Sequence, residues 1–535
     1  MNPPKKITVA YQHYDTEDDS IVIDGIDTSW NDFGYHTRTH YTVYIEGHDP
    51  INLRAHIGII DSKESIKPST YANELNAELE SIFQGVNHDF KYFTLLRDTE
   101  QYRQIVRELG PTKAKNVLLS VNDLVALKEF GVTLDGLDDF ESSDVFRISF
   151  LRSSEAFFAF KNAGSILRGM FSEEVGVLPE TLTIEFSPPT RCNSYNLQFK
   201  FNHSGDLPKR ISIIIGKNGV GKSQTLAQIA RSAIKDDGKL RDGKHERPAI
   251  NRLLAFAPTN ETNSVFPSDK RLKSNIWYRR FSLNRSSRRK GTDGLAGLIV
   301  QLARSNQRIG RTSRWDIFCQ ALTAISDHEQ LCLRLNRQSS LNFEYIQGLT
   351  IKTEMHLLDT LASIDTNSEP TRAIGDSFYQ LSSGELSFIK FAAQASLNIE
   401  NGSLLLLDEP ETHLHPNFIS RFALLLDTLL ELTGSSAIIA THSAYFVREV
   451  FREQVSVLGI EENQIIVRAP LMQTFGADVG ALSYFVFGED EPSRLAINVE
   501  KRLIKKELSW PKLYEKYKDD LSLEFLNSLR NEIEG

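Results

Sequence analysis

Cysteine is scarce in this sequence, and long apolar runs are absent. Only three of the 535 residues are cysteine, Cys192, Cys319 and Cys332. Because they are far apart and odd in number, neither a disulfide framework nor a zinc site is expected. No apolar run approaches the roughly 18 residues that a membrane-spanning helix needs, and the first residues lack the apolar core of a signal peptide. We therefore expect a cytoplasmic protein with reduced thiols and no membrane contact.

Acidic residues outnumber basic residues over most of the chain, and one segment is the exception. The formal net charge is -9, yet residues 241–314 contain 17 Lys and Arg against 5 Asp and Glu. Such asymmetry can mark a surface for nucleic acid or for an acidic partner. The length predicts about three domains or lobes, at roughly 100 to 200 residues each.

A glycine-rich loop near the middle of the chain carries the strongest motif. The β-branched run 211–215 predicts a strand buried on both faces, and the apolar spacing after residue 222 predicts a helix. Between them, residues 216–223 read G-x-x-x-x-G-K-S, the phosphate-loop pattern in its required setting. Such a loop points backbone N–H groups at phosphate oxygens, its lysine reaches the β- and γ-phosphates, and its serine ligates Mg²⁺. The predicted nucleotide-binding residues here are Gly216, Asn218, Gly219, Gly221, Lys222, Ser223 and Gln224.

Three further segments follow in order. The run 404–407 predicts a core strand that ends in Asp408 and Glu409, where one carboxylate suits Mg²⁺ and the other suits a proton acceptor. Before it, Ser382, Ser383 and Gly384 open an amphipathic segment, and a serine at a helix start is either an anion site or an ordinary N-cap. After it, an apolar strand ends at His442, and a single histidine there is more often structural than catalytic.

Taken together and in this order, the four segments resemble the ATP-binding cassette (ABC) ATPases. The resemblance implies an α/β ABC-ATPase head, a P-loop NTPase with a mixed sheet flanked by helices, here with an N-terminal β-rich and helical extension. It implies ATP and Mg²⁺ as cofactors, with Ser223 and Asp408 on the metal and Glu409 activating water. It also implies a head-to-tail dimer, in which Ser382, Ser383 and Gly384 of one subunit face the γ-phosphate held by the other, while His442 senses that phosphate.

Two departures from the family pattern affect the expected turnover. Glu385 stands where the signature usually has glutamine. No glutamine follows the predicted strand 252–260 closely, so the Q-loop residue is unassigned, with Asn260 and Asn263 as alternatives. We expect hydrolysis to be slow, or ATP to act mainly as a conformational ligand.

The densest basic stretch, 270–290, interleaves aromatic residues with nine cations. Cations bind phosphate backbones and aromatic rings stack on unpaired bases, which predicts nucleic-acid contact. The alternative is a solvated loop whose aromatic side chains pack on the head. The predicted contact residues are Lys270, Arg271, Lys273, Arg279, Arg280, Arg288 and Arg289.

The remaining segments complete the expected domain organisation. Residues 1–65 read as a β-rich region and 66–180 as mainly helical. The ATPase head spans 181–470, with strands at 181–189 and 195–203 leading into its sheet and a basic insertion around 241–314. Residues 471–535 form a helical tail. His413 and His415 lack a third metal ligand in the sequence, so we interpret them as structural.

The tail is short and lacks the D-x-D pair of a topoisomerase–primase nuclease, so no nuclease domain is expected. Long coiled-coil arms are excluded, since sustained heptads and a C-x-x-C hook are missing. With the DEPETHLHP and FGADVGALSYFVFG segments, the chain resembles the PtuA-type ATPases of Septu and Septu-like retron anti-phage systems. That resemblance implies higher oligomers, an HNH nuclease partner and, in the retron version, a reverse transcriptase with its RNA–DNA hybrid. A stand-alone DNA-repair ATPase and a non-hydrolysing scaffold remain as alternatives.

Overall fold

A computed structural model describes most of the chain. The described residues are 7–11, 19–29, 31–32, 34–60, 70–83, 91–168, 178–188, 193–258, 265–268, 276–283, 294–305, 307–335, 340–343, 360–361, 363–375, 377–412, 414–462, 464–487, 494–506 and 508–534. Within these ranges, no helix is both long enough and apolar enough to cross a lipid bilayer. Cys332 is buried and Cys319 half-buried, both as free thiols, and Cys192 lies outside the described residues.

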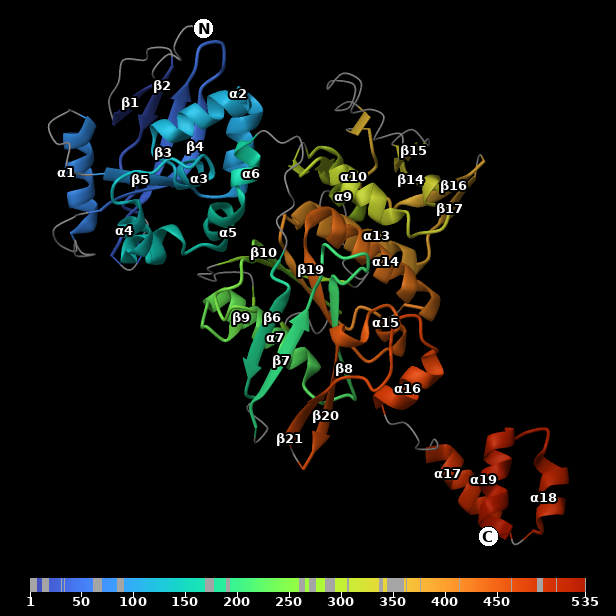
Figure 1. The fold of residues 1–535 in the computed structure, drawn as a ribbon. Coiled ribbons are helices and arrows are strands. Elements are labelled where there is room, and N and C mark those ends of the chain that lie inside the picture. Colours follow the sequence, from blue (N-terminus) through green and yellow to red (C-terminus); the bar gives the residue numbers. More distant parts are fainter. Residues whose placement is uncertain are drawn as a thin grey trace.

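A seven-stranded sheet forms the centre of the head (Figure 1), in the order β11-β10-β18-β19-β8-β20-β21. Its strands are β8 (Ile211–Gly216), β10 (Arg252–Ala257), β11 (Trp277–Ser282), β18 (Leu404–Asp408), β19 (Ser436–Thr441), β20 (Val455–Glu461) and β21 (Gln464–Arg468). Neighbouring strands are parallel, except that β21 runs antiparallel to β20. Every residue of β8, β18 and β19 is buried, as continuous apolar runs predict. The carboxyl ends of these three strands therefore meet at one edge of the sheet.

Alternate residues of the central strands face two different layers. On one face, Ile214, Leu406 and Ile438 pack with helix α7 (Lys222–Lys235). The same layer contains a three-stranded antiparallel sheet of β6 (Thr181–Phe186), β7 (Tyr195–Lys200) and β9 (Leu240–Asp242). The prediction that 181–189 and 195–203 lead into the ATPase sheet is wrong in this respect, because β6 pairs with β7 on one side and with β9 on the other, in a separate sheet.

The opposite face is covered by a helical lobe. Ile213, Leu405 and Ile439 pack there in one core with the lobe helices. These are α9 (Leu295–Ala303), α10 (Arg314–Leu322), α13 (Ser383–Asn398), α14 (Pro416–Thr433) and α15 (Ala444–Val447). A four-stranded antiparallel sheet extends the lobe, with β14 (Leu331–Arg334), β15 (Ser340–Asn342), β16 (Thr371–Ile374) and β17 (Ser377–Gln380).

The N-terminal domain has its own five-stranded sheet. The strands lie in the order β1 (Thr8–Tyr11), β2 (Ser20–Ile23), β3 (Arg38–Tyr44), β4 (Ile51–Ile60) and β5 (Lys91–Leu96). Its helices are α1 (Tyr71–Phe83), α2 (Thr99–Ser120), α3 (Leu124–Glu129), α4 (Leu137–Ser142), α5 (Ser154–Asn162) and α6 (Gly164–Leu167). Strands β1 to β4 all lie before residue 65, in agreement with the β-rich region predicted there. However, β5 lies within the range predicted to be mainly helical and pairs with β4, so one hydrophobic core spans both predicted regions.

The C-terminal tail is not a simple appendage to the head, and the basic segment is not a simple insertion into it. Helix α16 (Val479–Phe487) packs on the head through the fully buried Leu482. Helices α17 (Arg494–Ile504), α18 (Trp510–Tyr517) and α19 (Leu523–Glu534) share a small separate core. The range 241–314 contains β10, a strand between two others of the central sheet, and is therefore partly integral to the head.

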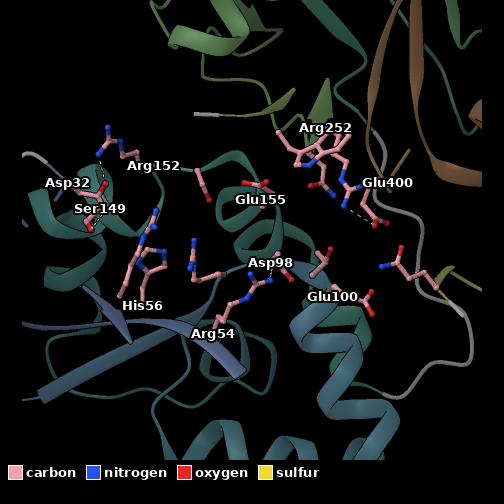
Figure 2. A pocket seen from close by; sticks show the side chains of 17 residues that line it. Asp32, Arg54, His56, Asp98, Glu100, Ser149, Arg152, Glu155, Arg252 and Glu400 are labelled. Atoms are coloured by element: carbon pink, nitrogen blue, oxygen red, sulfur yellow. Dashed lines mark hydrogen bonds and ion pairs between the residues drawn. The ribbon is translucent and has the colours of Figure 1, made fainter. Parts of the chain in front are cut away.

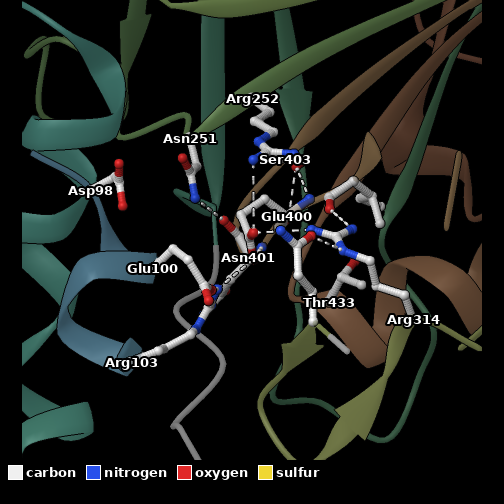
Figure 3. Close-up of polar contacts among 12 residues, drawn as sticks. Asp98, Glu100, Arg103, Asn251, Arg252, Arg314, Glu400, Asn401, Ser403 and Thr433 are labelled. Carbon is white, nitrogen blue, oxygen red and sulfur yellow. Dashed lines mark hydrogen bonds and ion pairs between the residues drawn. The ribbon is translucent and has the colours of Figure 1, made fainter. Parts of the chain in front are cut away.

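The N-terminal domain contacts the head beside the amino ends of β10 and β18. The two domains enclose a cavity of about 500 Å³ (Figure 2). Next to it, Glu400 forms ion pairs with Arg103 of α2 at 3.1 Å and with Arg314 of α10 at 3.2 Å (Figure 3). On the other side of the contact, the buried Phe158 ring of α5 lies against Gly402, where an added Cβ would be only 2.4 Å from the ring. Packing and charge thus both join the domains.

Candidate nucleotide site

The phosphate loop leaves β8 at a position where only glycine fits. A Cβ on Gly216 would lie 2.4 Å from the carbonyl oxygen of Leu458, on the neighbouring strand β20. Gly219 and Gly221 have φ values of +81° and +101°, which side chains other than glycine rarely adopt. Asn218 in the loop and Gln224 in the first turn of α7 are exposed. The loop therefore curls over the N-terminus of α7, as an anion-binding loop must.

Lys222 is nearly enclosed by this loop. Its side chain is 5% exposed, and Nζ donates to the carbonyl oxygens of Gly216 at 2.9 Å and Lys217 at 3.3 Å. Burial lowers the pKa of the Lys222 ammonium below its ordinary value, against the opposing effect of nearby carboxylates. A buried ammonium that donates to carbonyl oxygens is a group that phosphate would bind strongly.

Ser223 and Asp408 join the phosphate loop to the acidic strand. The Ser223 hydroxyl donates to Asp408 Oδ1 at 2.8 Å, although the two residues are 185 positions apart in sequence. Asp408 is fully buried at the end of β18. A hydroxyl beside a carboxylate, next to a phosphate loop, is the oxygen donor set that Mg²⁺ prefers, so these residues fit the predicted cation.

Glu409 directly follows Asp408 and has a strained backbone. Its φ is +42°, in the left-handed region, and its N–H donates to the carbonyl oxygen of Ala440 at 2.8 Å. His442 Nδ1 lies 3.7 Å from Glu409 Oε1, with the imidazole 49% exposed. The strained backbone holds the Glu409 side chain at the edge of the sheet, which is where a water-activating carboxylate is required.

Glu411 is a site residue that the sequence analysis missed. Its side chain is 7% exposed, and Oε1 accepts from the Thr441 hydroxyl, from the His442 N–H at 3.1 Å, and lies 3.3 Å from His442 Nδ1. Burial raises the pKa of Glu411, while the hydrogen bonds from Thr441 and His442 oppose that shift. In the sequence, the only signal for this role was that Glu411 lies two positions after Glu409. Glu411 thus positions the strand end that carries His442.

The signature serines lie on the helical lobe, at the N-terminus of α13. Ser382 is the N-cap, and it forms a capping box with Glu385: the Glu385 N–H donates to Ser382 Oγ at 3.3 Å, and Glu385 Oε2 accepts from the Ser382 N–H at 2.8 Å. Arg372 of β16 donates to Glu385 Oε1 at 2.8 Å. Burial by itself would raise the pKa of Glu385, but the contacts with Ser382 and Arg372 lower it below its ordinary value. The glutamate at the glutamine position therefore has a structural role in this chain.

The signature residues lie on the surface of the helical lobe. Ser382 and Ser383 are both exposed, with Gly384 half-buried. Lys222, Ser223, Asp408, Glu409 and His442 come together around the sheet edge, whereas the signature opens onto the surface of the lobe. The structure thus assembles one half of the predicted site and leaves the other half facing solvent.

Only part of the basic segment lies within the described residues. Lys270, Arg271, Lys273, Arg288, Arg289, His413, Asn260 and Asn263 lie outside them. Arg279 donates to Asn398 Oδ1 at 2.9 Å, and Arg280 to the Phe266 carbonyl oxygen at 3.3 Å. The Phe281 ring is buried and stacks on Phe256, with 4.9 Å between centroids. His415 is the N-cap of α14.

The order of strands and the position of each motif settle the architecture. The fold is that of an ABC-type ATPase head. A glycine-rich loop follows β8, two acidic residues end β18, a histidine follows β19, and a serine–glycine segment begins the lobe helix α13. The mixed sheet flanked by helices is as the sequence predicts.

Comparisons with known proteins agree with a P-loop ATPase. Residues 360–448 match a family model described as "AAA domain, putative AbiEii toxin, Type IV TA system". Over 92% of its length the chain is 24% identical to protein ea59 of Escherichia phage lambda, covering 91% of that protein.

Solved structures give weaker likenesses. The cbiO1 component of the cbiONQ ABC transporter complex from Clostridium perfringens is 16% identical, with a TM-score of 0.27, covering 61% of this chain and 97% of that one. The SMC head domain from Thermotoga maritima is 12% identical, with a TM-score of 0.25, covering 56% and 100%.

Proposed function

We propose that two copies of this chain bind ATP and Mg²⁺ head to tail, hydrolyse the ATP, and through that cycle control a partner nuclease in an anti-phage defence complex of the Septu or retron-Septu type. The signature, which is exposed on the lobe and within the described residues has no hydrogen bond or ion pair to the otherwise assembled phosphate site, carries the first part of the proposal. A second copy would supply Ser382, Ser383 and Gly384 to the γ-phosphate held by Lys222. Each subunit would complete the pocket of the other.

Within one site, some residues would bind the phosphates and Mg²⁺, and another would accept a proton. The N–H groups of residues 217–223 and the Lys222 ammonium would hold the phosphates. Ser223 and Asp408 would hold Mg²⁺, which supplies charge neutralisation at the phosphates when bound. Glu409 would accept a proton from the attacking water, and His442, held by Glu411, would contact the γ-phosphate.

An exposed apolar surface supports a protein partner. Leu471, Phe475 and Tyr484 are 79%, 51% and 48% exposed, respectively, within the segment that follows the head. Phe475 stacks on Phe451 with 4.5 Å between ring centroids, so the surface is anchored to the head rather than unordered. Large exposed apolar side chains within one short segment of the chain can mark a protein interaction site. We assign this surface to the HNH-type nuclease subunit.

The comparisons give this proposal its biological setting. The matching family model carries a toxin–antitoxin description, and ea59 is a phage protein. Both support a role in conflict between phages and their hosts. In a retron system, the reverse transcriptase and its RNA–DNA hybrid would bind as well, with the segment 270–290 as the candidate contact.

Co-expression with the neighbouring genes tests the nuclease role. A tagged chain should retain a nuclease subunit through purification, and Phe475→Ala with Leu471→Ala should release it while the ATPase rate persists. Recovery of the chain alone, with tight binding of duplex DNA ends, would instead support a stand-alone repair ATPase. An ATP-dependent scaffold would be supported by a different result. In that case the complex is recovered, the Glu409→Gln substitution leaves it unchanged, and no phosphate release can be measured.

A further inference from the structure

A groove of about 670 Å³ lies on the head, where the three-stranded sheet meets the edge of the central sheet. Strand β7 forms one wall, and the first residues of β20 with the last residues of β21 form the other (Figure 1). Lys209, two residues before β8, also lines the groove, whereas the phosphate loop follows the opposite end of that strand. The groove is therefore separate from the nucleotide site.

The two walls are joined at one end. The Asn193 amide donates to the carbonyl oxygen of Ile465 at 2.8 Å and accepts from the Ile465 N–H at 2.9 Å. Toward the other ends of β7 and β21, Lys200 and Arg468 both line the groove. The groove thus opens between two strands that are tied together, so it exists before a ligand binds.

The groove is also separate from the basic segment 270–290. In the central sheet, β21 is the strand at one edge, and β11, which contains Arg279 and Arg280, is the strand at the other edge. Any ligand in the groove therefore uses a surface that the sequence analysis did not identify.

Cations outnumber carboxylates in the groove. Among the described residues of its wall, the only carboxylate is that of Glu453, which pairs with Lys209. Outside the wall, Glu461 pairs with Arg468. The cations of the wall are Lys200, Lys209, Arg452 and Arg468. Even with Glu461 counted, four cations face two carboxylates, and such an excess of positive charge favours a bound anion.

Two of these cations have no carboxylate partner within the described part of the chain. Arg452 donates through Nε to the carbonyl oxygen of Pro470 at 2.7 Å, which is a neutral acceptor. Lys200 is exposed at the end of β7. The hydrogen bond from Lys209 lowers the pKa of Glu453, and the charge of Lys200 lowers it further, which places Lys200 in the same electrostatic environment. Lys200 and Arg452 are therefore available to an anionic ligand.

The wall formed by β7 presents a row of polar side chains. Asn196, Gln198 and Lys200 are exposed, while the residues between them are buried, so all three project from the same face of the strand. Neighbours on one face of a strand are about 6.6 Å apart, comparable with the separation of consecutive phosphates in an extended single strand. Amide and ammonium groups both donate to phosphate oxygens. The row therefore suits a polynucleotide backbone.

The place of the groove distinguishes a nucleic acid from an acidic peptide. Phe451 lines the groove, and Phe475 of the surface assigned above to the nuclease subunit stacks on it at 4.5 Å between ring centroids. A strand bound in the groove would lie beside that subunit, where a nuclease needs its substrate. This choice between the two classes of ligand rests on the proposed function.

We propose that this groove binds the phosphate backbone of a single-stranded nucleic acid, with Lys200 and Arg452 as the main contacts. Backbone contacts carry no sequence information, so affinity should be nearly independent of sequence. A duplex is too wide to enter a groove of this volume. Because bound phosphates release counterions, affinity should fall steeply as the salt concentration rises.

Fluorescence anisotropy of the full-length Lys222→Ala chain, without ATP or nuclease, tests the proposal, because that variant lacks phosphate affinity at the loop. A labelled oligo-dT of about 12 nucleotides, within the usual site sizes, should bind saturably. In the same background, Lys200→Gln with Arg452→Gln should weaken binding about tenfold or more, and should reduce the slope of log affinity against log salt by about 1.4, since each single-strand phosphate contact contributes about 0.7.

Lys113→Gln is the matched control. Lys113 is exposed on α2, outside the groove, so its loss should leave the affinity and the salt slope unchanged. Circular dichroism shows whether the double variant folds, and if it does not, the two single variants decide the outcome. The proposal is overturned if the Lys222→Ala chain shows no saturable binding, or if the folded groove variants bind the strand as tightly as their parent.

Two competitors test the class of ligand. Polyglutamate should not displace the strand, and a duplex of the same length should bind more weakly. Displacement by polyglutamate, or equal affinity for the duplex, would overturn the proposal. Strand binding in the groove by a chain that retains no nuclease on co-expression would support the groove and contradict the proposed function, so the two failures are distinguishable.

Discussion

The hydroxyl of Ser223 lies 2.8 Å from Asp408 Oδ1, and this hydrogen bond connects the phosphate loop to the acidic end of β18. We expect Ser223→Ala to abolish Mg²⁺-dependent ATP binding, because the hydroxyl is one of two oxygen ligands positioned for the cation. Ser223→Thr keeps a hydroxyl and should keep binding. Titration of a fluorescent ATP analogue with and without Mg²⁺ measures both. Equal Mg²⁺ dependence in Ser223→Ala and the wild type would contradict the assignment.

Glu409→Gln should slow phosphate release by about 100-fold or more, since a general base typically contributes that much. It should also lengthen the life of the ATP-bound dimer, because the substitution leaves the binding residues in place. Phosphate release and light scattering after gel filtration measure the two effects. Glu462→Gln, on the exposed turn between β20 and β21, is the control. If turnover and dimer lifetime both match the wild type, hydrolysis does not drive the cycle.

Mixing two inactive variants tests the shared pocket. Lys222→Ala removes the phosphate-binding half, and Ser383→Arg blocks the signature half without removing the Ser382 cap. Each should be inactive alone, and their mixture should regain part of the ATPase rate, because a mixed dimer contains one intact pocket. Lys222→Ala mixed with Asp408→Asn should regain nothing, since both changes affect the same half. Recovery in both mixtures, or in neither, would argue against a head-to-tail dimer.

Glu400 should be required for stability. Burial by itself would raise its pKa, but Arg103, Arg314 and Arg252 lower it to about 2. Glu400→Gln leaves these guanidinium groups without a counter-charge and should cost about 3–5 kcal/mol of unfolding free energy. The exposed Glu108→Gln is the control. Because the folded pKa is below the ordinary 4.5, the wild-type contribution is present above pH 4.5 and is lost as the pH falls toward 2.

His56 should make the protein sensitive to mild acid. Its imidazole is 3% exposed, hydrogen-bonds the Thr37 hydroxyl at 2.8 Å, and has a pKa of about 3 instead of 6.5. The unfolded chain therefore takes up the proton first, and unfolding free energy falls as the pH drops from 6.5 toward 3, by about 2 kcal/mol at pH 5. Urea unfolding at pH 8 and pH 5 should show this loss in the wild type and not in His56→Gln. An identical loss in both chains would remove His56 as its cause.

The sequence predicted the head well because its motifs are local. The strand–loop–helix around Lys222 and the acidic end of β18 each fall within about 20 residues, so spacing and hydrophobic pattern were enough. Strand pairing was harder: β6 and β7 were correctly placed as strands but assigned to the wrong sheet, since a pattern shows burial and not the pairing partner. Likewise, β5 was missed inside a range that otherwise reads as helical.

What the sequence determined alone is the chemistry available: a phosphate loop, an acid pair, a histidine and a serine–glycine helix start, in an order that fits an ATPase head. What only the tertiary structure decided is which of these groups meet. Ser223 reaches Asp408 across 185 positions, and Arg103 reaches Glu400 across 297. Such contacts, and the arginine-lined cavity between the domains, depend on how separate layers pack. No local pattern of residues encodes which distant residues come into contact.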